Sequence, residues 1–453
     1  MTIVSYLLEH KRIYNMLGIA VVAGIAMLMS TKGSSISLLS YLLEHNRIHN
    51  VLGIAVILGI AVLMSNNRRR INWKLVSIGL LLHFTLAVLV LKTSIGRDSI
   101  SYVAEGFTKL YIAADKGIEF VFGRLSDSQG PWGFTFAIKV LPVIIFFSAL
   151  MSMLFYLGIV QAVVMLLNKG IRPLLGTTGP ETLCAIANSF LGQTEAPLLI
   201  KHYLKSMTKS EFLVVMISGM GTISGSILAV FAVMGVPATH LLAASVMAIP
   251  ATILISKIIY PETEEPQAMC EATATHETQS GNVLDAISQG TSDGLWLALN
   301  VGAMLISFLA LLGMFNALLS FSCAKLNDLF SLNLPVITLD TIFSWICFPF
   351  GWLLGFTGSQ ALQASQLIGT KVAVNELVAY DKMLKMGLPE RTLSILTYAL
   401  CGFSNFSCIG IQIGGIGALV PDKRAWLSQL GVRAVFGGAL ANLLSAMVAS
   451  LLL

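Results

Sequence analysis

The sequence has few charged residues for its length. Only 11% of its 453 residues are Asp, Glu, Lys or Arg, whereas soluble domains carry about 25%. Apolar residues make up 56% of the chain, and its mean hydropathy is +0.81. A soluble chain of this length would form two or three domains, each with its own charged surface. The composition therefore excludes a soluble globular protein and a disordered one, and it predicts an integral membrane protein in contact with the lipid bilayer.

Several catalytic and cofactor-binding motifs are missing as well. The sequence contains no Walker loop, no HExxH and no GxSxG motif, and it has no segment large enough for a cytosolic nucleotide-binding domain. Its six cysteines include no CxxC pair and no Cys/His ligand spacing. These absences argue against an ATP-driven pump, a membrane hydrolase and a disulfide-rich secreted protein, and we expect no cofactor. The net charge of +5 falls in short clusters such as 68–70 and 423–424, which are typical of cytoplasmic loops rather than of nucleic-acid binding.

Nine charge-free apolar runs are long enough to cross about 30 Å of hydrocarbon. They cover residues 14–30, 50–66, 75–91, 140–167, 212–234, 238–256, 295–322, 392–420 and 434–453. Two further apolar stretches, 170–205 and 341–380, are interrupted by Gly and Pro residues, which break helices. We predict that each of these enters the membrane and returns as a helical hairpin. The stretch 93–130 is more polar, and its periodicity predicts one or two interfacial amphipathic helices.

The first 65 residues contain a tandem duplication. Residues 5–30 and 40–65 are identical at 20 of 26 positions, with a period of 35. Two copies do not make a solenoid, and two adjacent spanning copies would have opposite orientations, so they cannot have the same structural role. We predict that the second copy, which is followed by three arginines at 68–70, is the first working helix, and that residues 1–39 are peripheral.

A second and fainter repeat contains the candidate functional residues. The tetrapeptide GQTE (192–195) lies in the first broken stretch, and the segment GMGTIS (219–224) begins 24 residues after its glutamate. The dipeptide NE (375–376) follows the second broken stretch, and the segment GFSNFS (402–407) begins 26 residues after its glutamate. Two repeats with discontinuous helices are typical of a secondary transporter with one central binding site.

The residue types at these positions suit a polar but neutral solute. An ionisable group at membrane depth is costly, so it persists where it is paired, hydrated or bound to something. Glu195 lies beside Gln193 and Thr194, and Glu376 lies beside Asn375. Carboxylates and amides provide directed hydrogen bonds, which a polyhydroxylated or heterocyclic solute needs more than charge neutralisation.

The same residues allow two further interpretations. Backbone carbonyls freed at a helix break can hold a small hard cation together with a hydroxyl such as that of Thr222. Alternatively, each glutamate could occupy an ordinary loop, because Lys201 follows the first glutamate, while Lys371 and Asp381 flank the second. The paired arrangement of the two repeats favours the functional interpretation.

Four motifs, in this order and spacing, resemble those of the concentrative nucleoside transporters. They are GQTEAP (192–197), SEFLVVMISGMGTISGSILA (210–229), KVAVNELVAY (371–380) and CGFSNFSCIGI (401–411). The resemblance covers residues 50–453. It implies an all-α integral membrane protein and a homotrimer, in which each protomer has about eight spanning helices, interfacial helices and two re-entrant helical hairpins in an inverted-repeat transport domain. It also implies sodium-coupled symport of nucleosides such as uridine into the cell by an elevator-type movement, in a multi-pass protein of the bacterial inner (plasma) membrane.

Taken with the hydropathy pattern, the resemblance divides the chain into six segments. They are the peripheral duplicate (1–39), scaffold and interfacial helices (40–165), the first hairpin with its following helices (166–258), a polar acidic loop (259–291), a scaffold helix (292–335), and the second hairpin with the last two helices (336–453). We expect the two hairpin segments to form the transport repeats and to enclose one central site.

The resemblance also implies which residues contact the substrate. Those on the nucleobase side would be Gly192, Gln193, Thr194, Glu195 and Ile227. Those on the ribose side would be Glu376, Phe403, Asn405 and Cys408. The family commonly has a serine where this chain has Cys408, and a thiol is a weaker hydrogen-bond partner than a hydroxyl.

A sodium site is implied at the first hairpin. Its ligands would be the side chain of Asn188, the carbonyls of Leu191 and Ile223, and the hydroxyl of Thr222. Because Thr222 keeps a hydroxyl where serine is usual, sodium is favoured over the proton as the coupling ion. Proton-coupled relatives exist, so a proton-coupled nucleoside symporter stays open as an alternative.

Three other functions are compatible with the residues. The same scaffold could transport another small polar solute, or it could form an uncoupled, channel-like pathway. A membrane enzyme could use Glu195 and Glu376 as an acid/base pair. The residues by themselves favour a secondary transporter with a two-repeat site rather than an enzyme, and nucleosides as substrate come only from the resemblance.

Overall fold

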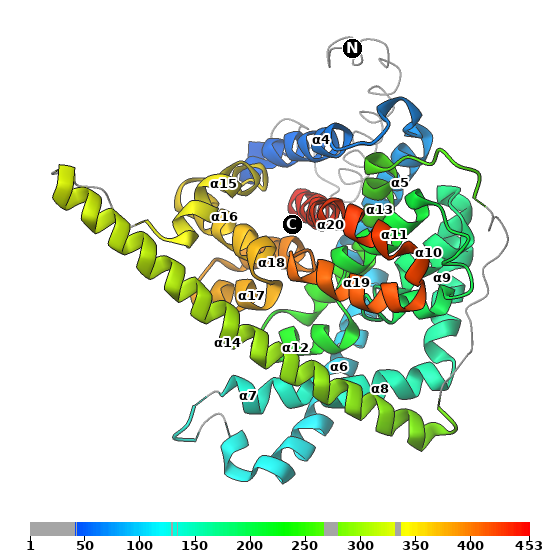
Figure 1. The fold of residues 1–453 in the computed structure, drawn as a ribbon, viewed down its shortest axis with the longest axis horizontal. Helices are drawn as coiled ribbons and strands as arrows, with labels where there is room; N and C mark the ends of the chain where they lie inside the picture. The colour runs from blue at the N-terminus through cyan, green and yellow to red at the C-terminus, as the bar shows by residue number, and fades with distance from the viewer. Residues whose placement is uncertain (1–40, 42, 128–129, 134, 267–279, 331–336) are drawn as a thin grey trace.

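The computed structural model describes residues 41, 43–127, 130–133, 135–266, 280–330 and 337–453. Every regular element in these residues is a helix (Figure 1). Seven helical segments among them are long and apolar enough to span a membrane, or eight if the bent pair α15 (Leu339–Leu353) and α16 (Gly358–Ala373) counts as one span. The predicted all-α membrane fold is confirmed. Residues 1–39, which carry the first copy of the duplication, lie outside the described residues.

The second copy of the duplication forms the first described spanning helix. Helix α4 (Arg47–Leu63) comes from this copy, and the arginines at 68–70 form a single 3₁₀ turn before α5 (Trp73–Lys92). Helix α6 (Ser94–Phe122) follows at once and has too little apolar character to count as a span. Its exposed side chains include Tyr102 and Phe120 beside charged residues, as expected for an amphipathic interfacial helix.

Two scaffold helices pack along each other beside the rest of the molecule. A short helix α7 (Phe136–Lys139) leads into α8 (Leu141–Tyr156), and α14 (Val283–Phe330) runs obliquely across the molecule and packs on α8 (Figure 1). Glycines allow the close approach, because a Cβ on Gly294 would lie 2.8 Å from the Cα of Ile145. Helix α8 ends near Gly158, whose φ of +76° favours glycine. The apolar run 140–167 is therefore divided between α8 and the next helix.

The remaining helices form two repeats with the same order of elements. The first contains α9 (Ile159–Leu175), α10 (Gly179–Ala187), the 3₁₀ helix η4 (Ala196–Ile200), α11 (Lys209–Gly221), α12 (Gly225–Met234) and α13 (Ala238–Ile259). The second contains α15, α16, α17 (Glu376–Lys385), α18 (Glu390–Leu400), α19 (Ser407–Leu419) and α20 (Arg424–Leu452). Corresponding elements pack alike, since α11 packs on α13 as α18 packs on α20, and α20 also packs on both α11 and α13. The faint sequence repeat is therefore a structural one.

Each repeat contains a broken helix where the sequence suggests a continuous one. The chain leaves helical conformation at 222–224, between α11 and α12, and at 401–406, between α18 and α19. Glycines lower helix propensity at both points, and Ser224 caps the new helix by accepting a hydrogen bond from the Ile227 amide at 3.4 Å. The runs 212–234 and 392–420 are therefore interrupted helices, whose freed backbone groups need other partners.

The base of the first hairpin is held by buried charges. Glu181 in the first turn of α10 and Lys257 on α13 form an ion pair of 2.7 Å, and both side chains are buried. Thr178 and Thr208 cap α10 and α11 through capping boxes, and the Thr178 hydroxyl donates to Glu211 at 2.6 Å. Side chains therefore join the N-terminal end of α10 to the N-terminal end of α11 and to α13.

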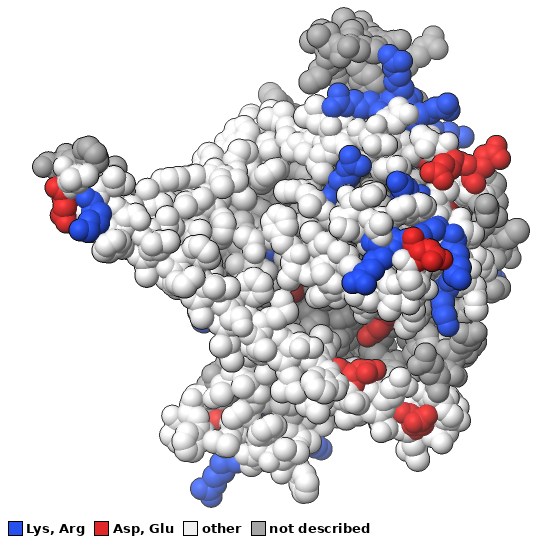
Figure 2. Space-filling view, in the orientation of Figure 1, with Lys and Arg blue, Asp and Glu red and all other residues white. Residues whose placement is uncertain are grey.

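Most of the surface in the view of Figure 2 carries no charge. Lys and Arg side chains gather on one side of this face, and the broad middle is uncharged. Helix α14 adds a row of exposed apolar side chains, and few of its residues are buried. The row includes Leu299, Ile306, Leu309, Met314, Phe315, Leu318 and Phe321. Such a surface suits contact with lipid or with other apolar helices.

Candidate functional site

The tip of the first hairpin contacts the broken helix of the second repeat. Gln193 lies in the turn between α10 and η4, and its side-chain oxygen accepts a hydrogen bond from Gln412 Nε2 at 3.1 Å. Gln412 is fully buried on α19 and also donates to the Met216 carbonyl at 3.0 Å. Thr194 packs against Gly415, where any Cβ would overlap its side chain. The two repeats therefore share one polar cluster.

The second hairpin contributes a buried carboxylate to the same region. Glu376 begins α17, directly after its N-cap Asn375, and is only 7% exposed. Its Oε2 accepts a hydrogen bond from Asn405 Nδ2 at 3.1 Å, and Asn405 is in turn fixed because its Oδ1 accepts from the Cys408 amide at 3.1 Å. The Cys408 thiol lies beside the side chains of both Gln193 and Asn405. The structure thus brings Gln193, Glu376, Asn405 and Cys408 together. The Glu376 carboxylate, which can accept charge-assisted hydrogen bonds, lies among amide groups.

The two helix breaks are in direct contact. The Phe403 amide donates a hydrogen bond to the Thr222 carbonyl at 3.2 Å, and the Gly225 amide donates to the Phe190 carbonyl of the first hairpin at 3.0 Å. Ile227, in the first turn of α12, is 5% exposed. The predicted residue Phe403 therefore lies in the second unwound segment, and Ile227 lies in the helical turn that follows the first one.

The residues of the predicted ion site also meet. Asn188 ends α10, and its amide nitrogen donates to Ser218 Oγ at 2.9 Å. The Thr222 hydroxyl donates to the Asn188 carbonyl at 2.8 Å, and Leu191 and Ile223 are buried close by in sequence. The Asn188 side-chain oxygen is buried and accepts no hydrogen bond from any described residue. A buried orphan acceptor is costly, and a hard cation would satisfy it.

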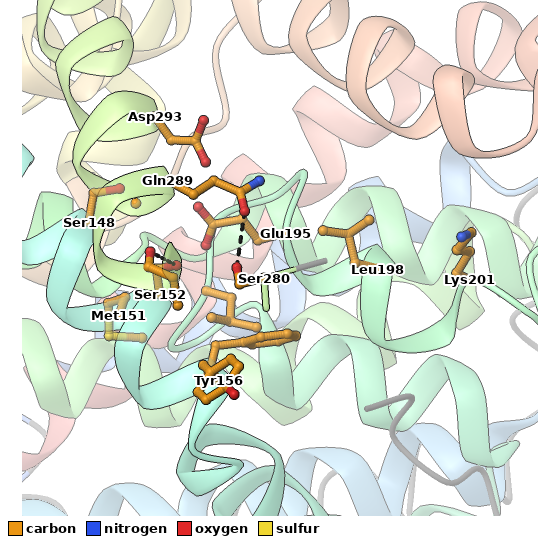
Figure 3. A pocket seen from close by; sticks show the side chains of 14 residues that line it. Ser148, Met151, Ser152, Tyr156, Glu195, Leu198, Lys201, Ser280, Gln289 and Asp293 are labelled. Atoms are coloured by element: carbon orange, nitrogen blue, oxygen red, sulfur yellow. Dashed lines mark hydrogen bonds between the residues drawn. The ribbon is translucent and has the colours of Figure 1, made fainter. Parts of the chain in front are cut away.

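Glu195 faces a different space from Glu376. Its Oε2 accepts a hydrogen bond from the Gly192 amide at 3.1 Å, and its side chain lines a cavity of about 220 Å³ between the first hairpin, α8 and the start of α14. Figure 3 shows Glu195 pointing toward Gln289 and Asp293 of α14. In this arrangement Glu195 lies at the boundary between the first repeat and the scaffold, and the structure does not place it in the buried cluster.

Three family models of known proteins match successive parts of this chain. Residues 240–450 match the family described as "Na+ dependent nucleoside transporter C-terminus", residues 52–125 its N-terminus, and residues 137–238 the family described as "Nucleoside recognition". An uncharacterized transporter of Haemophilus influenzae is 43% identical over 394 residues, which cover 85% of this chain and 93% of that protein. The chain belongs to the concentrative nucleoside transporter family.

Other members of the family agree with this assignment. The nucleoside permease NupC of Helicobacter pylori is 38% identical over 397 residues, covering 85% of this chain and 93% of the permease. The solved structure of CNTnw in an inward-facing substrate-bound state superposes with a TM-score of 0.83 at 37% identity, covering 89% of this chain and 98% of CNTnw. The chain is therefore a membrane transporter and not an enzyme, and the acid/base role considered for Glu195 and Glu376 is abandoned.

In this family member, three polar residues for which the sequence predicted no role in the site complete the cluster. Gln412 on α19 donates to the Gln193 side-chain oxygen and to the Met216 carbonyl. Asn442 on α20 donates to the carbonyls of Gly221 and Cys401, both at 2.7 Å, and so satisfies backbone groups at both helix breaks. Lys371 near the end of α16 donates to Asn442 Oδ1 at 2.6 Å.

Each of these three residues had a weak signal in the sequence. Gln412 and Asn442 are single amides in apolar helices, a position where a polar side chain needs a partner. Lys371 is a charge beside Glu376, which left an ordinary loop open as an alternative for that glutamate, but the lysine is fully buried. The separation in sequence, 219 residues for Gln412 and Gln193 and 221 for Asn442 and Gly221, hides these pairs from inspection of any local motif.

Proposed function

We propose that this transporter carries nucleosides into the cell together with sodium, by an elevator-type movement of its two repeats against the scaffold helices. The observation that carries this proposal is the Asn188 side-chain oxygen, which is buried and accepts no hydrogen bond from the described residues, while the backbone carbonyl of the same residue accepts from the Thr222 hydroxyl. It lies at the hairpin that also holds Gln193. Ion and substrate would therefore bind to adjacent parts of one structural unit.

The polar cluster supports a nucleoside as the substrate. A carboxylate held by an amide, as Glu376 is by Asn405, can accept hydrogen bonds from vicinal ribose hydroxyls. Gln193 and Thr194 offer both donors and acceptors to the edge of a base, and Gly192 and Ile227 would border them. Glu195 would join the base side when the substrate is bound.

Oxygen ligands near the first hairpin support sodium as the coupling ion. The carbonyls of Leu191 and Ile223 would complete a site with the Asn188 and Thr222 oxygens, and these are the neutral, hard donors that such cations prefer. The end of α10 adds the partial negative charge of a helix C-terminus. Bound sodium would cancel this charge and hold the hairpin tip against the α11–α12 break.

The arrangement of the helices supports movement of the two repeats together, as one rigid body. The two repeats are joined by bonds such as Phe403 to Thr222, whereas the hairpin faces α8 and α14 across the cavity lined by Glu195 and Asp293. The exposed apolar face of α14 supports a homotrimer, since a helix interface would cover it. We place the protein in the inner (plasma) membrane of a bacterium as a multi-pass protein.

The test is uptake of labelled uridine into proteoliposomes that contain the purified protein. Uptake is compared with an inward sodium gradient and with sodium replaced by choline at the same pH. We expect accumulation above the external concentration in sodium and little uptake in choline. Asn188→Ala should lose the sodium dependence, and Asn66→Ala, in the loop after α4, serves as the matched control.

Other outcomes would change the proposal. Equal uptake in sodium and choline would contradict sodium coupling, and uptake driven by a pH gradient would replace it with proton coupling. Equilibration without accumulation would indicate an uncoupled pathway. Failure of unlabelled nucleosides to compete would show that the substrate is another small polar solute.

A further inference from the structure

In each repeat, the C-terminal ends of two helices meet near the centre of the molecule. We call this meeting point the junction, and the two repeats place different groups in it. In the first repeat, the C-terminal ends of α10 and α11 meet at Asn188 and Thr222. In the second repeat, the equivalent helices α16 and α18 also end beside each other. There the Lys371 ammonium, from the last turn of α16, donates to the carbonyl of Ala399 at 3.1 Å, one residue before α18 ends.

The environment of this lysine is that of a bound cation. Lys371 is 1% exposed, and its second acceptor is the side-chain oxygen of Asn442 at 2.6 Å. Among the residues that the structure describes, no carboxylate forms an ion pair with it. Neutral oxygens and the negative end of a helix therefore contact the charge directly, as they would contact a metal cation, and the Glu376 carboxylate acts on it from beyond ion-pair distance.

We propose that Lys371 is a tethered cation that takes, in the second repeat, the position that sodium takes in the first. This inference rests on the sodium site of the proposed function, and it deepens that function by assigning one mobile ion to each protomer. A fixed ammonium excludes a second sodium ion from the equivalent junction. Coupling of one sodium per nucleoside follows from it.

Lys371 is also a positioning residue for the substrate cluster. Asn442 accepts from Lys371 and donates to the Gly221 and Cys401 carbonyls, which belong to the two helix breaks. The second break continues through Phe403 to Asn405, which holds Glu376. The ammonium thus fixes the segment that presents Asn405, in the way that sodium would fix the first hairpin at Asn188.

The experiment measures uridine binding to the purified full-length protein by calorimetry, at constant ionic strength, with choline replaced stepwise by sodium. The slope of log affinity against log sodium concentration gives the number of sodium ions bound with uridine. Lys371→Ala removes the ammonium and leaves space, whereas Lys371→Gln keeps donors toward Ala399 and Asn442 without charge. Lys382→Ala is the matched control, because this lysine of the same hairpin pairs with Asp340 at 2.6 Å, away from the junction.

We expect a slope of one for the wild type and for Lys382→Ala. Lys371→Ala should bind uridine about tenfold more weakly at low sodium, its slope should rise toward two, and methylammonium should restore its affinity and raise its melting temperature. Lys371→Gln should lose affinity at an unchanged melting temperature and show no rescue, because glutamine fills the space without supplying charge.

Two results would overturn the inference. One is wild-type affinity and slope in both Lys371 variants. The other is weaker binding by Lys371→Ala that neither sodium nor methylammonium corrects, which would show a packing role only. If Lys371→Ala does not fold, Lys371→Gln decides, since wild-type affinity there excludes a role for the charge. A wild-type slope of zero would contradict sodium coupling itself, and the methylammonium rescue would still test Lys371 independently.

Discussion

The amide of Phe403 donates a hydrogen bond to the carbonyl of Thr222 at 3.2 Å, and this bond joins the broken helices of the two repeats. Thr222 belongs to the predicted ion site, and Phe403 precedes Asn405 of the substrate cluster. The two sites are therefore one hydrogen bond apart through the backbone. A shift of one break would therefore displace the other, and the proposed coupling between ion and substrate could act through this bond.

Replacing Glu376 with Gln should nearly abolish transport without unfolding the protein. The substitution removes the charge-assisted acceptor for Asn405 and for a ribose hydroxyl, at a cost of about 1.5–3 kcal/mol, or roughly 10- to 150-fold in affinity. Uridine uptake at subsaturating concentration measures the effect, and gel filtration checks the fold. Uptake like that of the wild type would remove Glu376 from the substrate site.

Thr222→Ala should weaken sodium dependence, and Thr222→Ser should largely keep it. Alanine removes the hydroxyl that donates to the Asn188 carbonyl and that would bind the ion, whereas serine preserves it. A sodium titration of uridine uptake should therefore shift to higher concentration for alanine by about tenfold. If the alanine variant gives the wild-type titration, Thr222 is not an ion ligand.

Gln412→Leu should weaken nucleoside binding, although Gln412 lies outside the motifs. Leucine would leave the Gln193 side-chain oxygen and the Met216 carbonyl without their donor. Gln193 would then lose its fixed orientation, and we expect affinity to fall by about tenfold. Binding calorimetry should show this loss and no change for Gln429→Leu on the exposed face of α20. Equal affinities for the two variants would contradict the orienting role.

Gly402→Ala should destabilise the transporter, in contrast to Gly410→Ala. A Cβ at position 402 would overlap Asn442 Oδ1 and lie 2.9 Å from the Met220 carbonyl, whereas one at position 410 meets nothing within 4 Å. We expect a loss of about 1–3 kcal/mol for the first and a gain of about 0.5–1 kcal/mol for the second, which lies in helix α19. Thermal melting in detergent distinguishes the two, and similar melting temperatures would show that the second break can move away from Asn442.

Much of the fold can be predicted from the sequence, because the local chemistry of each segment determines where helices begin, end and break. Apolar runs locate the spans, and the Gly and Pro residues of 170–205 and 341–380 locate the hairpins. The pairing of GQTE with Asn375-Glu376 anticipates the two repeats. The breaks at 222–224 and 401–406 were missed, because hydropathy does not register a short loss of helical conformation whose backbone groups are satisfied by a residue as distant as Asn442.

The candidate site is predictable only in part, for the same physical reason. Gln193, Glu376 and Asn405 lie in recognisable motifs, and the structure brings them together. Lys371 carries a charge whose burial cannot be inferred from neighbours, since its partners are 28 and 71 residues away. The orientation of Glu195 toward α14 depends on how the repeat docks on the scaffold, and no local pattern encodes that docking.

The ion pair between Lys257 and Glu181 ties the base of the first hairpin to α13. Swinging this hairpin outward like a flap on a hinge would separate two buried opposite charges, and breaking a buried pair costs about 3–5 kcal/mol. Thermal motion at room temperature supplies such energies only rarely. We therefore expect any movement of the first hairpin to carry α13 and the neighbouring helices with it, because this ion pair ties the base of the hairpin to α13.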